Sequence, residues 1–103
     1  MILNLLWEKL LETQKLIEEE CDAIKKLLLQ KNRLYGNSAL EPINVFSQLS
    51  ALAQIDVRID DKLKRLQNLS KSGDIDTLNE DTVLDLIGYL ILRRVYGKKV
   101  NKD

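Results

Sequence analysis

The fold is decided by an unbroken stretch at residues 2–32, which reads ILNLLWEKLLETQKLIEEECDAIKKLLLQKN. This stretch contains neither proline nor glycine, so no residue in it interrupts a helix. Apolar residues recur with alternating spacings of four and three, which is the heptad pattern of an amphipathic helix. We therefore expect one long helix here. The series that carries the pattern is Leu3, Trp7, Leu10, Gln14, Ile17, Cys21, Ile24 and Leu28.

An amphipathic helix of this length has to cover its apolar stripe, either on later helices of the chain or on another subunit. Gln14 is the one polar member of the series, and a lone polar residue in such a stripe can specify register or oligomeric state. A helix that spans an intramolecular bundle explains the pattern equally well. Both explanations of the stripe stay open, and for the whole chain we predict a homo-oligomer.

Turn-forming residues separate this helix from the rest of the chain. Residues 35–38, YGNS, have the composition of a turn, and their glycine can take the positive φ of a helix C-cap. We expect residues 33–46 to form a connection that includes a short helix starting near Pro42, because proline suits the first turn of a helix. Val45 and Phe46 would anchor this short helix on the core.

A second long helix is predicted over residues 47–71, with Ser47 as its N-cap. Asp56 falls where the helical period places the apolar face. It is therefore either a buried functional acid or a residue at the boundary of that face, and we favour the boundary. The predicted apolar stripe of this helix is Leu49, Leu52, Ile59, Leu63 and Leu66.

A third helix is predicted over residues 78–96, because Thr77 and Glu80 have the spacing of a capping box before a fresh apolar run. The basic residues 97–103 are expected to form a frayed tail. No strand pattern is present in the sequence. We predict a single all-α domain over residues 1–103, a bundle of three long helices plus a short connecting helix. The third helix would pack through Val83 or Leu84, Ile87, Leu90, Ile91 and Val95.

Composition narrows the classes of function. Sixteen basic and sixteen acidic residues cancel in a chain of 103, so there is no global field to attract a nucleic-acid duplex. The single cysteine and the absence of histidine indicate a reducing compartment and argue against histidine-based catalysis and zinc. A bound metal would be a hard ion such as Mg²⁺. With neither a secretory signal nor an apolar run of ~20 residues, we expect a cytoplasmic protein without membrane association.

One polar stripe in the second helix has the chemistry of a phosphate site. Arg58, Asp61, Lys62 and Arg65 recur at helical spacing opposite the leucines. Arginine forks suit phosphate oxygens, and the carboxylate between them could orient the forks or accept a sugar hydroxyl. A solvent-exposed face with ion pairs explains the same pattern.

Two pairs of acids could bind a metal ion. Asp81 and Asp85 lie one turn apart on the third helix, and on the first helix either Glu18 or Glu19 could pair with Asp22 at helical spacing. Carboxylates on facing helices build metal sites in other bundles, and two carboxylates from each helix could converge on one Mg²⁺. A solvated acidic face beside Lys25 and Lys26 is the alternative.

Three motifs in this order resemble the nucleotide modification associated domain 1 family, a group of small proteins common in phages and prophages. The motifs are KNRLYGNS at residues 31–38, VRIDDKLKRL at residues 57–66 and EDTVLDLIGY at residues 80–89. The resemblance covers about residues 17–92. It implies a role in phage nucleotide metabolism or base modification.

The pattern is also distantly similar to the MazG-like all-α nucleotide pyrophosphohydrolases, in which acids on two helices hold Mg²⁺ around a nucleoside triphosphate. That similarity implies Glu19, Asp22, Asp81 and Asp85 as metal ligands. The second acidic pair is spaced E-x-x-D in those enzymes, whereas Asp81 and Asp85 are four residues apart, so nucleotide binding is favoured over hydrolysis. The predicted ligand-binding residues are Lys31, Arg58, Lys62 and Arg65 at phosphates, Tyr35 or Asn37 near the base or sugar, and Asn32, Gly36, Asp61 and Tyr89 in the same motifs.

Three functions are consistent with these features. The first is a Mg²⁺-dependent step similar to that of the pyrophosphohydrolases. The second is a nucleotide-binding module without chemistry, for instance a phage protein that sequesters a nucleotide signal used in host defence. The third is a helical protein that binds a protein partner through the stripe from Leu3 to Leu28.

Overall fold

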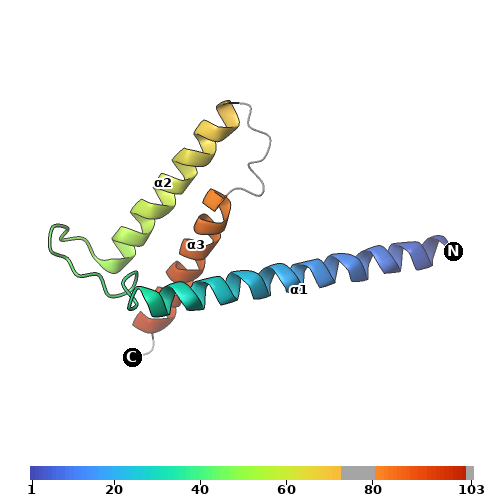
Figure 1. The fold of residues 1–103 in the computed structure, drawn as a ribbon, viewed down its shortest axis with the longest axis horizontal. Helices are drawn as coiled ribbons and strands as arrows, with labels where there is room; N and C mark the ends of the chain where they lie inside the picture. Colours follow the sequence, from blue (N-terminus) through green and yellow to red (C-terminus); the bar gives the residue numbers. More distant parts are fainter. Residues whose placement is uncertain (73–80, 102–103) are drawn as a thin grey trace. The chain divides into compact units, whose positions relative to one another are not determined.

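A computed structural model describes residues 1–72 and 81–101, and within these ranges the chain is all-α with no strand. The predicted fold class is confirmed. Helix α1 spans Ile2–Leu34, α2 spans Ala51–Lys71 and α3 spans Asp81–Val100 (Figure 1). The chain divides into two compact units, Met1–Lys31 and Asn32–Asp103. None of the helices is long and apolar enough to cross a membrane, as far as the described residues extend.

Helix α1 forms as the heptad pattern predicts and ends at a glycine turn. Gly36 has a φ of 60° and Asn37 a φ of 61°, both in the left-handed region. The backbone N–H of Asn37 donates to the carbonyl of Asn32 over 3.1 Å, which is the long hydrogen bond of a Schellman motif. The C-cap role predicted for Gly36 is therefore confirmed, with the helix two residues longer than expected.

The apolar stripe of α1 stays largely open. None of the helix's residues is buried, and six of the eight positions of the heptad series are exposed. Ile24 and Leu28, near its C-terminal end, are half-buried. The helix thus exists as a long amphipathic element, but the side chains that give it its period are not covered within its own unit.

The predicted short helix of the connection is wrong. Residues 35–50 form turns and bends instead. The N–H of Glu41 closes a turn onto the carbonyl of Asn37, and the residue before a proline is biased away from helix, so this turn does not continue through Pro42. Asn44 then has a φ of 57°, which a right-handed helix cannot include. Phe46, expected to anchor the short helix on the core, is 99% exposed.

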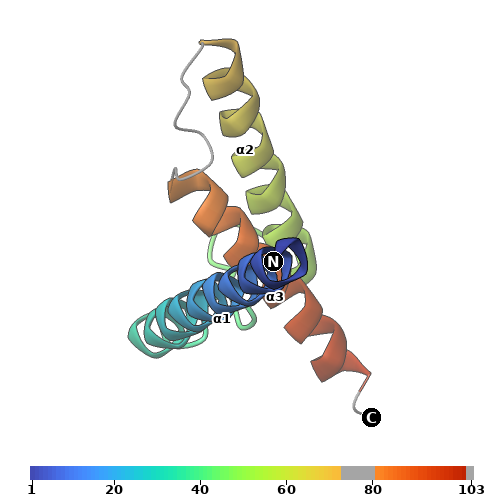
Figure 2. The same cartoon turned by 90° about the vertical axis from the view of Figure 1, so that its right-hand side faces the viewer.

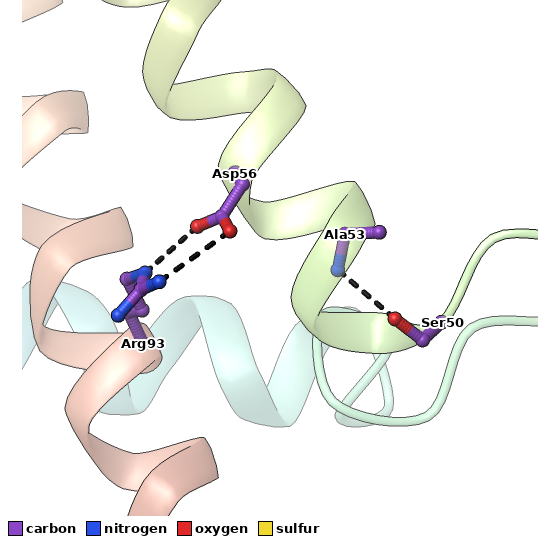
Figure 3. Close-up of polar contacts among 4 residues, drawn as sticks. All are labelled: Ser50, Ala53, Asp56 and Arg93. Carbon is purple, nitrogen blue, oxygen red and sulfur yellow. Dashed lines mark hydrogen bonds and ion pairs between the residues drawn. The ribbon is translucent and has the colours of Figure 1, made fainter.

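Helix α2 begins at Ala51 and is capped by Ser50, whose hydroxyl accepts a hydrogen bond from the N–H of Ala53 over 3.1 Å (Figure 3). The predicted cap at Ser47 is wrong, since that hydroxyl accepts from the N–H of Leu49 in a local turn before the helix. The helix end at Lys71 is as predicted.

Helices α2 and α3 lie side by side and run in opposite directions (Figures 1 and 2). Ile55 on α2 is 1% exposed, and it is the one buried hydrophobic side chain of the described residues. On α3 the buried residues are Thr82 and Gly88, both small. Small residues at a helix contact let the two backbones approach closely, so this pair forms the centre of the packed structure.

The packing faces of both helices differ from the predicted ones. On α2 the first turns, residues 51–56, are half-buried or buried on all sides, and after them only positions at four–three spacing are half-buried. These positions are Ile59, Lys62, Leu66 and Leu69, so Lys62 lies on the packing face and the predicted Leu63 does not. Leu49 and Leu63 are exposed instead. On α3 three predicted packing residues are exposed, because this helix is apolar around most of its circumference and spacing cannot select a face. These three are Leu90, Ile91 and Val95.

Helix α3 ends later than predicted, and the start predicted for it is not described. Its predicted start at residue 78 and the capping box of Thr77 and Glu80 lie outside the described residues. Its predicted end at residue 96 is wrong, since the helix continues through Gly97 to Val100, where a frayed tail was expected. Residues 102–103 are not described.

Substitution of Gly36, in the turn after α1, and of Gly97, near the end of α3, should change stability in opposite directions. A Cβ built on Gly97 meets nothing within 4 Å, so Gly97→Ala should raise stability by about 0.4–1 kcal/mol by reducing the entropy of the unfolded chain. Gly36 has equally open space but a φ of 60°, and Gly36→Ala should cost about 1–2 kcal/mol. Thermal melts followed by far-ultraviolet circular dichroism measure both. Stabilisation by Gly36→Ala would contradict the left-handed turn.

Candidate functional site

Polar side chains link α2 to α3 at three successive levels of the helix pair. Each step toward the C-terminal end of α2 is matched by a step toward the N-terminal end of α3, as an antiparallel pair requires. Four of the six residues involved belong to the predicted ligand or metal set. The three contacts are Asp56 with Arg93, Arg58 with Tyr89, and Lys62 with Asp85.

The contact between Lys62 and Asp85 is the least exposed of the three. Lys62 Nζ lies 3.2 Å from Asp85 Oδ2, and the two side chains are 12% and 32% exposed. The ammonium group thus sits against α3, whereas the sequence placed it on a stripe that faces a ligand. Removing one partner of such a pair leaves the other with little water to solvate it, which makes the pair costly to break.

The contact between Arg58 and Tyr89 is a cation–π contact. The guanidinium carbon of Arg58 lies 5.8 Å from the centroid of the Tyr89 ring. Arg58 is exposed and Tyr89 is half-buried, so the guanidinium group covers one side of the ring while facing solvent. An exposed contact of this kind contributes about 0.5–1 kcal/mol.

The contact between Asp56 and Arg93 is a two-point ion pair. Arg93 donates from Nε to Asp56 Oδ1 over 2.8 Å and from Nη2 to Asp56 Oδ2 over 3.5 Å (Figure 3). The hydrogen bond that Arg93 donates to Asp56, together with the negative charge of that carboxylate, raises the pKa of Arg93. Asp56 is 43% exposed, so it is a boundary residue as predicted and not a buried acid.

The other two members of the predicted phosphate stripe pair along α2. Arg65 Nε lies 3.3 Å from Asp61 Oδ2, one turn away, and both side chains are more than half exposed. A solvent-exposed pair at this spacing contributes a few tenths of a kcal/mol and is easily rearranged. The predicted stripe is therefore split, since Lys62 faces α3 while Arg65 and Asp61 face solvent.

The glycine turn is stabilised by its own residues. Asn32 Nδ2 donates to Asn37 Oδ1 over 2.9 Å across the left-handed turn. Tyr35 is exposed, and the N–H of Ser38 returns to its carbonyl. Lys31 closes the first unit and Asn32 opens the second. The hydrogen bonds shown for residues 32–38 are local, and they account for the asparagines and glycine of this motif as turn-forming residues.

The four predicted metal ligands belong to two units that are described separately, Glu19 and Asp22 to Met1–Lys31 and Asp81 and Asp85 to Asn32–Asp103, so their convergence on one Mg²⁺ stays a prediction. Within residues 1–72 and 81–101, no group of three or more acidic or thiol side chains is close enough to hold an ion. Asp85 faces the Lys62 ammonium, with which a cation would compete. Glu19, Asp22 and Asp81 are exposed.

Two features of the helix pair were not predicted from the sequence. The predicted apolar stripe omits Ile55. This residue lies three positions after Leu52, a helical spacing that indicates membership of the stripe. Arg93 was assigned to no site, and its pairing with Asp56 depends on which face α3 turns toward α2. No local sequence signal gives that rotation.

No protein-family model matches the chain, and no curated protein or solved structure is significantly similar to it. The resemblance to the nucleotide modification associated domain 1 family thus rests on the three motifs. It stays a prediction.

Loss of the Asp85 carboxylate should destabilise the helix pair. Asp85→Asn leaves the nearly buried Lys62 ammonium without its charged partner, and we expect a cost of about 1–3 kcal/mol in urea unfolding. Asp61→Asn removes a carboxylate from an exposed pair on the same helix pair and is the matched control, with an expected change within about 0.5 kcal/mol. Equal costs for the two substitutions would show that the Lys62–Asp85 contact does not stabilise the pair.

Proposed function

We propose that this chain binds a phosphate-bearing nucleotide on the α2–α3 pair, at the side formed by Arg58 and Tyr89. One observation carries the proposal. An exposed guanidinium group lies 5.8 Å from the centre of a half-buried aromatic ring contributed by the other helix. Guanidinium groups bind phosphate oxygens in a fork, and an aromatic ring offers a surface on which a base can stack.

The charges along α2 extend this side. Arg65 lies seven residues after Arg58, two helical turns further on the same side of the helix and about 10 Å away along its axis. Its present partner, Asp61, is exposed and weakly held, so the Arg65 fork can turn to a second phosphate. Lys62 lies between the two arginines but is held by Asp85. In this proposal Lys62 fixes the rotation of α2 about its axis, and this rotation orients Arg58 and Arg65 toward the ligand.

The motifs support the same ligand class. Arg58, Lys62, Asp85 and Tyr89 come from two motifs that resemble the nucleotide modification associated domain 1 family. In the folded chain they form two contacts between those motifs, Arg58 with Tyr89 and Lys62 with Asp85. A soluble nucleotide as ligand places the proposed activity in the cytoplasm, which is the host cytoplasm for a phage protein.

Binding without turnover is the form of the proposal that the side chains favour. Hydrolysis of the pyrophosphohydrolase kind needs several carboxylates around Mg²⁺. Here Asp85 is neutralised by Lys62 over 3.2 Å. A protein that sequesters a nucleotide signal needs affinity alone, which arginine forks and stacking supply.

A second function is favoured by a different observation. Helix α1 presents an exposed apolar stripe, and exposed stripes of that size mark interaction surfaces. Association of α1 with a protein is independent of nucleotide binding on the α2–α3 pair. The two functions can coexist in one chain.

The nucleotide proposal predicts ligand-dependent stabilisation that requires Arg58. A panel of nucleoside mono-, di- and triphosphates and cyclic nucleotides, without added metal, should contain at least one member that raises the melting temperature. At a hundredfold excess over its Kd the expected stabilisation is about 2.7 kcal/mol. Arg58→Gln should weaken binding about tenfold or more, since a charge-assisted hydrogen bond contributes about 1.5–3 kcal/mol.

The matched control is Lys64→Gln, which removes one positive charge from another side of the same helix. It should leave binding within about twofold, because screened surface charges act weakly at a distance. Chromatography of the recovered ligand, repeated with Mg²⁺, separates binding from turnover. Absence of any shift across the panel, or an equal loss in Arg58→Gln and Lys64→Gln, would contradict the proposed site.

A further inference from the structure

Helix α1 has an apolar stripe that its own unit, Met1–Lys31, leaves open. We define the α1 stripe as Leu3, Trp7, Leu10, Gln14, Ile17, Cys21, Ile24 and Leu28. Leu3 is 79% exposed and Trp7 60%, and Leu6, Leu11 and Leu27 beside the stripe are exposed as well. A helix with this much uncovered apolar surface is not stable alone in water, since most helical stability comes from tertiary packing of the apolar face.

We propose that the α1 stripe pairs with the same stripe of a second copy of this chain, as a parallel, in-register two-stranded coiled coil. The proposal goes beyond nucleotide binding and does not depend on it. It specifies the partner, the direction of the two helices and their register.

The spacing of the stripe gives the first argument. In heptad notation Trp7, Cys21 and Leu28 occupy a positions, and the d positions carry only leucine and isoleucine. A repeat of 3.5 residues keeps one seam facing a partner helix over its whole length, which is the property of a supercoiled pair. The d residues are Leu3, Leu10, Ile17 and Ile24.

Gln14 gives the second argument, because it distinguishes the two directions. In a parallel, in-register pair an a position meets the same a position of the partner, so the two Gln14 amides meet and can hydrogen-bond to each other. An antiparallel pair that keeps the stripes in contact places a against d, and Gln14 then lies opposite Ile17. A buried amide without a partner costs about 1–3 kcal/mol. The parallel direction avoids this cost.

Charge complementarity gives the third argument. Glu20 is at a g position and Lys25 at the following e position, and a parallel pair brings g of one helix beside that e of the other. Two attractive Glu20–Lys25 pairs result. Lys25 already lies 3.6 Å from Asp22 in its own helix, but both side chains are about two-thirds exposed and an ammonium group has three donors, so it can serve both acids. The antiparallel alignment instead brings Glu20 beside Thr13.

Cysteine crosslinking tests direction and register together. Cys21, the only cysteine, is exposed and occupies an a position, so the two thiols of a parallel pair face each other. In the antiparallel alignment Cys21 lies opposite Leu10, and the two Cys21 residues are about 16 Å apart along the axis. Disulfides need Cα atoms within about 7 Å. Diamide takes up the two electrons and two protons that the thiols release, so the full chain can be oxidised without metal.

The expected result is a disulfide-linked Cys21 homodimer that forms far faster than random encounters between separate chains would allow. At about 10 μM protein, pairing at millimolar effective concentration accelerates the reaction about a hundredfold over a control thiol off the stripe. Glu19→Cys in a Cys21→Ser background is that control, since residue 19 lies at the outward-facing f position. Equal rates for the wild type and this control would overturn the proposal.

A mixing experiment separates the two directions. Wild-type chain is oxidised together with a size-tagged Leu10→Cys, Cys21→Ser chain. Parallel pairing gives two homodimers and little mixed product, whereas dominance of the mixed disulfide would overturn the parallel arrangement in favour of the antiparallel one.

Reduced protein supplies a measurement free of crosslinking. Sedimentation at 1–100 μM should show a dimer, and the emission of Trp7, the only tryptophan, should shift to the red on dilution as the pair separates. Leu10→Lys should weaken the dimer at least about tenfold, because it places two like charges in the seam. Leu16→Lys makes the same change at an exposed position off the stripe and should keep the dimer.

Three results would contradict the pairing itself: a monomer at all these concentrations, an equal loss in both lysine variants, or a dimer unaffected by Leu10→Lys. Nucleotide binding to the α2–α3 pair is measured separately with Arg58→Gln, so failure of either proposal leaves the other in place.

Discussion

In the unit Asn32–Asp103, the ion pair between Lys62 and Asp85 is the directional contact that accounts for how α2 and α3 are rotated against each other. Hydrophobic burial alone does not fix this rotation, because Ile55 is the one buried hydrophobic side chain of the described residues and α3 is apolar on most sides. A directional contact of 3.2 Å with little exposure selects one rotation among several of similar burial. The contacts of Arg58 with Tyr89 and of Asp56 with Arg93 then follow at the same register.

The helices could be predicted from the sequence because local signals determine them. The four–three spacing and the absence of breakers in residues 2–32 predict α1, and Gly36 marks its end through the left-handed turn. The faces of α2 and α3 could not be predicted in full. A helix's period gives a face only where apolar and polar residues separate cleanly, and α3 does not separate them. Ser47 and Ser50 show the same limit on a smaller scale, since both suit a cap and only the fold selects Ser50.

The sequence predicts which residues belong to the candidate site better than it predicts how their side chains are arranged. Spacing placed Arg58 and Lys62 on one polar side of α2 and singled out Asp85 as one of two acids a turn apart on α3, and the motifs added Tyr89. The spacing could not indicate that the lysine turns to α3 while the arginine reaches solvent. Lys62 lies where the four–three apolar series needs a residue, and its long aliphatic chain can occupy such a position while its ammonium group reaches a carboxylate. A pattern that classes each residue as either polar or apolar cannot represent a lysine whose aliphatic chain packs while its ammonium group forms an ion pair.

The connection before α2 determines where proteases are expected to cleave the folded protein first. Phe46 is fully exposed in a segment without helical hydrogen bonding, which is the kind of backbone that proteases enter first. A cut after this residue by an enzyme that selects aromatic side chains separates all of α1 from the intact α2–α3 pair. Limited proteolysis is thus expected to give two fragments. One contains the apolar surface of α1, and the other contains the charged surface of the α2–α3 pair.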